Sequence, residues 1–531
     1  MQRTRLRFST AIITGLLLAA CGDDKDSEPA TTSVGSLQPD AEAALTKAFA
    51  SLGGKDDLAE LRGFEYESSG DQYVLNEGFE PNSVTFTTAY ETKRTIAISG
   101  DQLRLETERS INFIGVSTDN TYVQIINGNA GFIQGDEALF TPATPPSDTP
   151  LTSARIGAVK KQQMLLNPHL LLAMVARGDA TATSAGVDLV NGQLQQVIEV
   201  GGVRLYIDAS SGFVTKAAVL EDVSPYKDAM VEAVYDGWMP GNGTGVMFPM
   251  LVAMTVAGER VLAESRTVTT ALAQLDETLF TLPGQPAAFS QTEAQRGMNG
   301  SAGLNQPQAL GIPFRDNLQN TVTPVELAPG VWHITGASHN SMVVEQANGY
   351  VLVEAPLDPL RTQAIANWAA TQMPGKPLSY VIATHHHEDH SSGVRQAVGR
   401  GARLIAHKTG ADFWQRVLAA PATVVKDSLS DSPPRTTVTF VGDGDSMLLP
   451  DATNPVTAYS VGNCHAADML VIGVGNMMFA SDIVSPGNGQ PICPITETVS
   501  AIQAYGFSPT MVVGGHGATA LVADLVAQYG N

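Results

Sequence analysis

The hydrophobic and polar positions of this chain follow one pattern in its first half and another in its second half. Between residues 83 and 256, short segments alternate apolar with polar residues or are rich in β-branched residues, which is typical of half-buried strands. Apolar residues at helical spacing precede these segments at residues 40–50 and interrupt them at residues 159–177. The pattern predicts a strongly curved antiparallel sheet with a few helices against it, over residues 39–285.

Residues 286–320 lack such periodicity and are rich in Gln, Ala, Gly, Asn and Pro, which predicts a linker. Over residues 321–531, apolar strand-like runs alternate with helical segments, as in domains where helices connect the strands of a sheet. A chain of 531 residues exceeds what one hydrophobic core normally organises, so two domains also fit its length. The predicted class of the whole chain is α+β.

The first 20 residues have the composition of a targeting segment. A basic head with Arg3, Arg5 and Arg7 precedes an apolar stretch that is too short to span a bilayer. The stretch ends in Leu18-Ala19-Ala20-Cys21, which resembles the bacterial lipoprotein signal, whose cysteine is lipidated and becomes the new N-terminus. An ordinary secretory signal with a chance cysteine is the alternative. Residues 21–38 are polar and without apolar periodicity, which predicts a flexible tether.

The signal resemblance and the charge of the chain bound its location and its partners. The resemblance implies an exported bacterial lipoprotein, held by the lipid on Cys21 in a membrane and facing the periplasm or the cell surface. The formal charge is −22, and removal of a signal with three arginines makes it −25, so nucleic acid would be repelled. We therefore expect a small-molecule substrate. In an oxidising compartment, Cys464 and Cys493 either form a disulfide or remain two buried thiols.

Candidate chemistry is concentrated in Thr384-His385-His386-His387-Glu388-Asp389-His390. Four imidazoles and two carboxylates occupy six consecutive positions here, directly after the apolar run 378–383. Neutral imidazole and carboxylate suit zinc and similar divalent metals, and burying so many polar groups without partners is unfavourable. Nine of the ten histidines lie beyond residue 332, and further ligand-type residues follow later apolar strands at His465, Asp482 and His516.

In their order along the chain, these residues resemble the signature of the metallo-β-lactamase superfamily: His-x-His-x-Asp-His, then one His, one Asp and one His. The resemblance covers about 210 residues and implies an αββα sandwich with a site for two divalent metal ions at one edge of two packed sheets. We expect both ions to be zinc. The implied ligands are His385, His387 and His465 for the first metal, Asp389, His390 and His516 for the second, and Asp482 as the bridge between them.

Asp389 is the predicted catalytic residue of this site. Two cations about 3.5–4 Å apart lower the pKa of a shared water toward neutrality, so hydroxide is available at pH 7. Asp389 is expected to orient this water and to pass a proton to the leaving group. His386 and Glu388 alternate with the ligands and are expected to point away from the metals, in supporting roles.

Weaker candidates lie outside the cluster. Glu354 occupies the position where the superfamily usually has an aspartate that braces the histidine-rich loop, and its longer side chain puts this role in question. His407 at a strand end is a candidate neighbour of the ligands, and His339 in a turn is a candidate substrate contact. His169 is expected to be structural. The first domain, through its strand pattern and residues 235–283, resembles the half-barrel of periplasmic lipoprotein carriers; lipid capture, substrate capture and a spacer role all remain open.

The resemblance implies a metal-dependent hydrolase. An aspartate at position 482 is similar to the glyoxalase II, lactonase, phosphodiesterase and RNA-processing branches, whereas β-lactamases of the superfamily typically have Cys or a non-ligand there. Charge and export disfavour RNA and glutathione thioesters, which leaves an ester, lactone or related amide bond outside the cytoplasm. The alternatives are β-lactam hydrolysis, a mononuclear iron sulfur-dioxygenase, and a lipid-binding lipoprotein whose second domain is inert.

Overall fold

The structure is a computed structural model. It describes residues 41–113, 116–138, 148–311, 320–431, 438–487, 489 and 491–530. The predicted signal, Cys21 and the predicted tether lie outside these residues. None of the helices in the described ranges is both long and apolar enough to cross a membrane.

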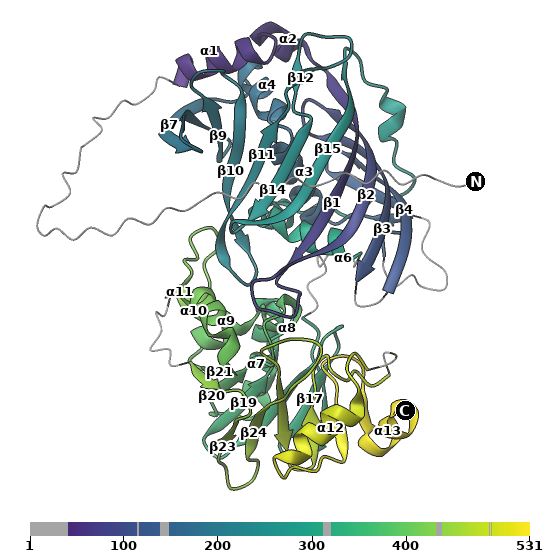
Figure 1. Cartoon of the computed structure of the whole chain (residues 1–531), viewed down its shortest axis with the longest axis vertical. Coiled ribbons are helices and arrows are strands. Elements are labelled where there is room, and N and C mark those ends of the chain that lie inside the picture. The colour runs from purple at the N-terminus through teal and green to yellow at the C-terminus, as the bar shows by residue number, and fades with distance from the viewer. Residues whose placement is uncertain are drawn as a thin grey trace, which may run out of the picture. The chain divides into compact units, whose positions relative to one another are not determined.

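The first half of the described chain is dominated by one antiparallel sheet, whose strands curve strongly (Figure 1). Its strand order is β6-β5-β4-β3-β2-β1-β15-β14-β11-β10-β9-β8-β7. The strands of this sheet are β1 (Gly63–Leu75), β2 (Val84–Ala97), β3 (Gln102–Phe113), β4 (Val116–Asn127), β5 (Ala130–Gly135), β6 (Asp148–Pro150), β7 (Ala182–Val190), β8 (Gln193–Val200), β9 (Val203–Asp208), β10 (Val214–Val223), β11 (Lys227–Asp236), β14 (Leu251–Val256) and β15 (Glu259–Leu272). A separate short pair is β12 (Met239–Pro240) and β13 (Met247–Phe248).

The helices of this half pack mainly against one face of the sheet. Strands such as β3 and β11 alternate between buried and more exposed residues, because one face lies on the core. The helical pattern at 159–177 corresponds to two helices interrupted at Pro168, since proline lacks an N–H and disfavours helix in the residue before it. The helical segments are α1 (Ala41–Ser51), α2 (Lys55–Glu60), α3 (Ser153–Leu166), α4 (His169–Arg177) and η1 (Glu277–Phe280).

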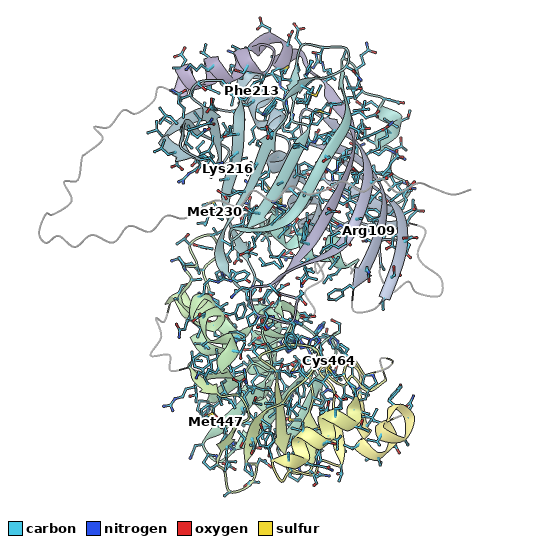
Figure 2. The ribbon with its side chains drawn as sticks, in the orientation of Figure 1. Arg109, Phe213, Lys216, Met230, Met447 and Cys464 are labelled. Carbon is cyan, nitrogen blue, oxygen red and sulfur yellow. A yellow bond between two sulfur atoms is a disulfide. The ribbon has the colours of Figure 1, made fainter. Side chains whose placement is uncertain are left out.

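Residues 291–310, which we expected to belong to a linker, are instead folded against the first half. They form α5 (Gln291–Asn299), η2 (Ser301–Leu304) and α6 (Asn305–Leu310). The helices α3 and α5 approach so closely that a Cβ on Gly297 would lie 1.8 Å from the carbonyl oxygen of Ala154. Arg109 of β3, labelled in Figure 2, donates a 2.7 Å hydrogen bond to the carbonyl of Gln308 in α6. Close helix packing and a buried cation thus hold this segment in place.

The second half contains two sheets of mixed direction. The first sheet has the order β16-β17-β18-β19-β20-β21-β22, and the second has the order β23-β24-β25-β26-β27-β28. The strands are β16 (Thr323–Ala328), β17 (Val331–Thr335), β18 (Ser341–Gln346), β19 (Gly349–Val353), β20 (Leu378–Ile382), β21 (Arg403–His407), β22 (Thr439–Val441), β23 (Ser446–Leu449), β24 (Val456–Ser460), β25 (Leu470–Val474), β26 (Met477–Phe479), β27 (Met511–Val513) and β28 (Thr519–Leu521).

One hydrophobic cluster joins these two sheets. It contains Val344 and Ile382 of the first sheet together with Leu470 and Phe479 of the second. Because helices also cover the other faces, β19 and β25 are buried along their whole length and read as continuous apolar runs. The helical segments are α7 (Pro359–Gln372), α8 (Glu388–Ser391), α9 (Val394–Gly399), η3 (Lys408–Gly410), α10 (Ala411–Ala419), α11 (Ser428–Asp431), α12 (Ile495–Ala504) and α13 (Val522–Tyr529). The predicted class, a sheet-rich first half and a mixed second half, is confirmed in outline.

Candidate metal centre

The seven ligand-type residues come together at the ends of strands from both sheets. His385 and His387 follow β20, which runs parallel to β19 and β21. Asp482 follows β26 and His516 follows β27, a second parallel pair. Because parallel strands end at the same edge of a sheet, the topology brings residues far apart in sequence to one place. His465, in the loop between β24 and β25, joins them there.

The first group of potential ligands consists of His385, His387, His465 and Asp482. Their ligand atoms all lie within 4.8 Å of one another. Nε2 of His465 is 3.3 Å from Nε2 of His385 and 3.2 Å from Oδ2 of Asp482. These residues are the predicted first-metal set together with the predicted bridge.

The second group consists of His339, Asp389, His390 and His516, whose ligand atoms also lie within 4.8 Å of one another. Oδ1 of Asp482 is 3.0 Å from Nε2 of both His390 and His516. One carboxylate oxygen of Asp482 therefore faces the second group while the other faces the first, as a bridging ligand requires.

In each of four imidazoles, the ring nitrogen that faces away from the ligand groups makes a hydrogen bond that holds the ring. Such outer contacts set the tautomer of a ligating histidine and orient its ring. Nδ1 of His385 lies 3.0 Å from the hydroxyl of Thr384, and Nδ1 of His390 lies 2.9 Å from Oε2 of Glu354. Nδ1 of His516 lies 3.0 Å from the carbonyl oxygen of Ser338. In His387 the roles are reversed, because Nε2 lies 2.9 Å from the carbonyl oxygen of Gly78 and Nδ1 is left for the site.

The chemistry of this donor set fits divalent cations. Oδ1 of Asp389 is buried without a hydrogen-bond partner, and Nε2 of His390 and Oδ1 of Asp482, which are 3.0 Å apart, are not aligned as a hydrogen bond, although partnered burial is the rule. Burial, reinforced by neighbouring imidazoles, lowers the pKa of His385 and His387 well below its ordinary value and keeps both rings neutral. Neutral imidazole and carboxylate are the forms that bind metal, and a cation would pair the orphaned atoms.

The two carboxylates of the site stay ionised despite their burial. Burial by itself would raise the pKa of Asp482, but His390 and His516 outweigh it and hold that pKa well below the ordinary value. The same balance, with His390 and His339 as the partners, lowers the pKa of Asp389. Asp389, the predicted catalytic residue, thus lies within the second group as a carboxylate.

Glu354 does reach the histidine-rich loop, although its length put that contact in question. Its side chain is fully buried, and its φ of 61° lies in the left-handed region. Oε2 lies 2.9 Å from Nδ1 of His390, and Oε1 accepts hydrogen bonds from the hydroxyls of Thr384, at 2.6 Å, and Ser481. Glu354 therefore connects β19, the His-rich segment and the turn that carries Asp482.

The other candidates separate into near and distant residues. His339 lies in the second group, with Nε2 2.9 Å from Oδ2 of Asp389, and burial lowers its pKa to about 3. His407 belongs to neither group: Nδ1 accepts from the N–H of Thr409 at 3.2 Å, and Nε2 donates to the Ser460 hydroxyl at 3.0 Å.

The structure turns His386 away from both groups and adds residues that the sequence did not indicate. Nδ1 of His386 is 2.6 Å from Asp468, a buried residue that follows His465. Nε2 of His386 is 3.1 Å from the carbonyl of Gly78, in the loop between β1 and β2. Asp468 follows a candidate ligand closely enough to be suspected from spacing, but nothing in the sequence links Gly78 to this site.

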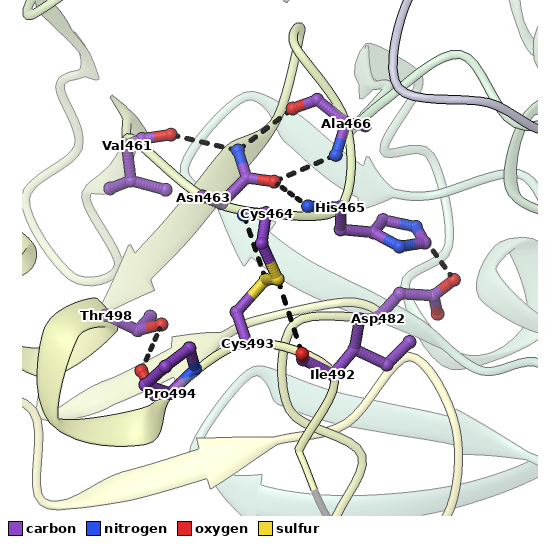
Figure 3. The surroundings of a disulfide bond; sticks show 10 residues. All are labelled: Val461, Asn463, Cys464, His465, Ala466, Asp482, Ile492, Cys493, Pro494 and Thr498. Carbon is purple, nitrogen blue, oxygen red and sulfur yellow. Dashed lines mark hydrogen bonds and ion pairs between the residues drawn. A yellow bond between two sulfur atoms is a disulfide. The ribbon is translucent and has the colours of Figure 1, made fainter. Parts of the chain in front are cut away.

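The two cysteines form a disulfide beside the first group, as Figure 3 shows. The Cα atoms of Cys464 and Cys493 are 5.7 Å apart, so the bridge ties the loop of His465 to the segment before α12. Oδ1 of Asn463 accepts hydrogen bonds from the N–H groups of His465, at 2.7 Å, and Ala466, at 2.8 Å. The same view shows His465 directed toward Asp482. Both devices restrain the loop that presents His465.

Comparison with known proteins assigns a superfamily to part of this chain. Residues 334–487 match the family model of the metallo-beta-lactamase superfamily. Similar solved structures include the metallo-beta-lactamase from Pontibacter korlensis, which is 16% identical, covers 40% of this chain and 98% of its own, and gives a TM-score of 0.32. The FIM-1 enzyme from Pseudomonas aeruginosa in its mono-zinc form is 19% identical, with 39% and 94% covered and a TM-score of 0.32. The metallo-beta-lactamase from Hirschia baltica is 22% identical, with 39% and 97% covered and a TM-score of 0.31.

A search of curated proteins gave no match. Six of the seven predicted ligand positions lie within the family match, and His516 follows it. The resemblance read from the sequence is thereby confirmed for this segment: residues 334–487 carry a metallo-β-lactamase superfamily domain.

Proposed function

We propose that this protein is a metal-dependent hydrolase that cleaves an ester, lactone or related amide bond outside the cytoplasm, at a site for two zinc ions within an αββα sandwich. The observation that carries the proposal is the pair of ligand groups that share Asp482, with one carboxylate oxygen facing each group. Two adjacent donor sets favour a binuclear hydrolase over a mononuclear iron dioxygenase.

The roles of the residues follow from their positions. Bound divalent cations would polarise the scissile bond and lower the pKa of the attacking water toward neutrality. Asp389 orients that water, accepts its proton on the buried carboxylate and delivers a proton to the leaving group. Glu354, Thr384 and the carbonyl of Ser338 hold the imidazoles in position, so that little reorganisation accompanies the reaction.

A cavity of about 730 Å³ borders the loop that carries His465 and has the size that small-molecule substrates require. Its lining includes Phe79, which follows Gly78, and Asn463, which lies two residues before His465. Apolar and polar side chains both contribute, among them Tyr505 and Ser460. None of the seven ligand-type residues lines this cavity, whereas His407, which belongs to neither ligand group, does.

One space in the described part of the first half argues against lipid binding at that place. The space between α3 and strands β1–β4 holds about 20 Å³, roughly the room for one water molecule. Its lining is polar, with Arg94, Arg109 and Gln124 among the residues. An acyl chain would have to displace these side chains from their buried hydrogen bonds.

We also propose that the protein is exported and anchored through a lipid on Cys21. The Cys464–Cys493 disulfide supports export, because disulfides persist in oxidising compartments and are rare in the cytosol.

The test combines metal analysis with a hydrolysis screen. Purified full-length protein is expected to hold about two zinc ions per chain and to cleave at least one member of a panel of esters, lactones, amides and β-lactams. His385→Ala and Asp389→Asn should abolish this cleavage, whereas His407→Ala, outside both groups, should retain most of it. Less than half a metal per chain, or activity unchanged in both site variants, would refute the proposal. Iron with oxygen uptake on a persulfide would instead establish the dioxygenase.

A further inference from the structure

The loop between β1 and β2, residues 76–83, lies against the metal groups although it precedes them by more than 300 residues. Nδ2 of Asn76 donates a 2.7 Å hydrogen bond to the carbonyl of His386. The carbonyl oxygen of Phe79 accepts one of 2.7 Å from the N–H of Ala467, two residues after His465. The loop thus contacts two of the three segments that present the first group.

The carbonyl of Gly78 is the hydrogen-bond partner of the outer nitrogen of His387. The oxygen of this carbonyl lies 2.9 Å from Nε2 of His387 and 3.1 Å from Nε2 of His386. A carbonyl accepts but cannot donate, so it requires the proton of His387 on Nε2 and leaves the lone pair on Nδ1. A backbone atom from the first half of the chain thereby selects the ligating tautomer of a residue in the second half.

Glu77 adds a carboxylate to the same place. Its side chain is 7% exposed, and Oε2 lies 3.8 Å from Nδ1 of His387, the atom left for the metal. Ligand atoms of Glu77, His387 and Asp389 lie within 4.8 Å of one another. The other oxygen, Oε1, accepts hydrogen bonds from Gln306 Nε2 at 2.6 Å and from the N–H of Glu388 at 3.2 Å, which holds the carboxylate in this orientation.

The loop is rigidly built. Asn76 and Asn82 both have a φ of 64°, and Oδ1 of Asn76 accepts from the N–H of Asn82 at 2.9 Å, closing the turn. A Cβ on Gly78 would lie 2.3 Å from Oγ of Ser83 and 2.8 Å from Oγ1 of Thr85, so a larger residue would force these side chains to move. A loop fixed at both ends can hold a carbonyl and a carboxylate at a metal without further ordering.

We propose that the β1–β2 loop completes the metal centre, with Glu77 as an additional carboxylate ligand beside His387 and the carbonyl of Gly78 as the group that positions His387. The proposal rests on the metal binding that the proposed function requires. It gives the first half of the chain a part in the active site, in place of a spacer role.

The test compares Glu77→Gln with Glu80→Gln, which makes the same charge change at an exposed position of the same loop. Full-length proteins are loaded with zinc and titrated with a chromophoric chelator, and parallel samples are loaded with cobalt(II) for absorption spectra. Glu77→Gln should weaken one of the two metal sites about 10–100-fold and change its cobalt spectrum, while Glu80→Gln should match the wild type in both. Glu77→Asp, which keeps a carboxylate, should recover part of the affinity.

The outcomes separate this proposal from the proposed function. If the wild type binds two metals and hydrolyses substrate while Glu77→Gln and Glu80→Gln are indistinguishable, the role of Glu77 is refuted and the hydrolase stands. If Glu77→Gln weakens binding without changing the cobalt spectrum, Glu77 acts through the loop and not as a ligand. A wild type that binds no metal refutes both.

Discussion

Replacing Glu354 by glutamine exchanges one carboxylate oxygen for an amide nitrogen at the base of the second metal group while keeping the shape of the side chain. The carboxylate accepts from Nδ1 of His390 at 2.9 Å, so that ring carries its proton on Nδ1 and presents Nε2 to the site. An amide N–H directed at Nδ1 would donate instead, and would move the ring proton to Nε2. That nitrogen lies 3.0 Å from Oδ1 of Asp482, where a metal needs a lone pair.

The expected loss of metal affinity follows from this change of tautomer. Substitutions of groups that orient metal-binding histidines typically weaken metal binding about 10–100-fold, which corresponds to about 1.4–2.8 kcal/mol. The effect should be confined to the second group, because the amide oxygen of glutamine can still accept from the Thr384 hydroxyl, which holds His385 of the first group. The left-handed φ of 61° at residue 354 costs about 1–2 kcal/mol and persists only because its contacts offset it, so Glu354→Ala should also lower the stability of the fold.

The assay is a two-step chelator titration of zinc-loaded protein, with Glu497→Gln on the exposed face of α12 as the charge-matched control. Glu354→Gln should release one zinc at a lower chelator concentration and the second zinc as in the wild type. Unchanged release of both ions would show that the amide turns its oxygen to His390 and that the carboxylate charge has no role. Equal weakening of both ions would refute the assignment of Glu354 to the second group.

Three further outcomes are expected from other parts of the fold. Burial lowers the pKa of His169 to about 4 in the folded protein, below the unfolded value of 6.5, so the unfolded chain binds one more proton between these pH values. The free energy of unfolding should therefore be highest above pH 6.5 and fall by about 3 kcal/mol as the pH drops toward 4. Denaturant titrations should show that His169→Phe removes this pH dependence. Replacing both Cys464 and Cys493 by serine, which opens a bridge across a sequence separation of 29, should lower the free energy of unfolding by about 3–4 kcal/mol and weaken binding of the first metal, as measured by denaturation and chelator titration. Gly297→Ala should destabilise the first half by about 1–3 kcal/mol in thermal unfolding, because its Cβ would meet the Ala154 carbonyl at 1.8 Å, whereas Gly303→Ala, which faces open space, should be neutral.

The sequence predicted the metal groups because their order along the chain carries the information. The His-rich cluster, Asp482 and His516 follow apolar runs, and parallel strands of a buried sheet end at one edge, whereas His465 lies in a loop between two antiparallel strands. His386 and Glu388 were separated from the ligands by their spacing alone, and the structure indeed turns His386 toward Asp468. The contact of Glu354 with His390 was less predictable, since side-chain length suggests reach only when the backbone conformation is known, and here φ is positive.

The folded segment at residues 291–310 had a local signal that composition concealed. Ser290 caps α5 by accepting from the N–H of Glu293 at 3.4 Å, the Ser-x-x-Glu spacing that often begins a helix. The glycines of this stretch, which contributed to the prediction of a linker, include Gly297, where the absence of a side chain permits contact with α3. Glycine enrichment therefore indicated close packing here. A glycine in a linker and a glycine in a helix contact differ only in whether another segment lies opposite it.

The role of the β1–β2 loop could not be predicted because it depends on backbone atoms and on long-range packing. The decisive group on Gly78 is a carbonyl, which every residue possesses, so no residue type marks it. Glu77 is one of 53 acidic residues in a chain with a net charge of −22, and its position beside His387 arises only when the first sheet meets the second half of the chain. Patterns of residue types identify the side-chain atoms that bind a metal. The groups that orient those atoms are common to all residues, so only the three-dimensional arrangement distinguishes them.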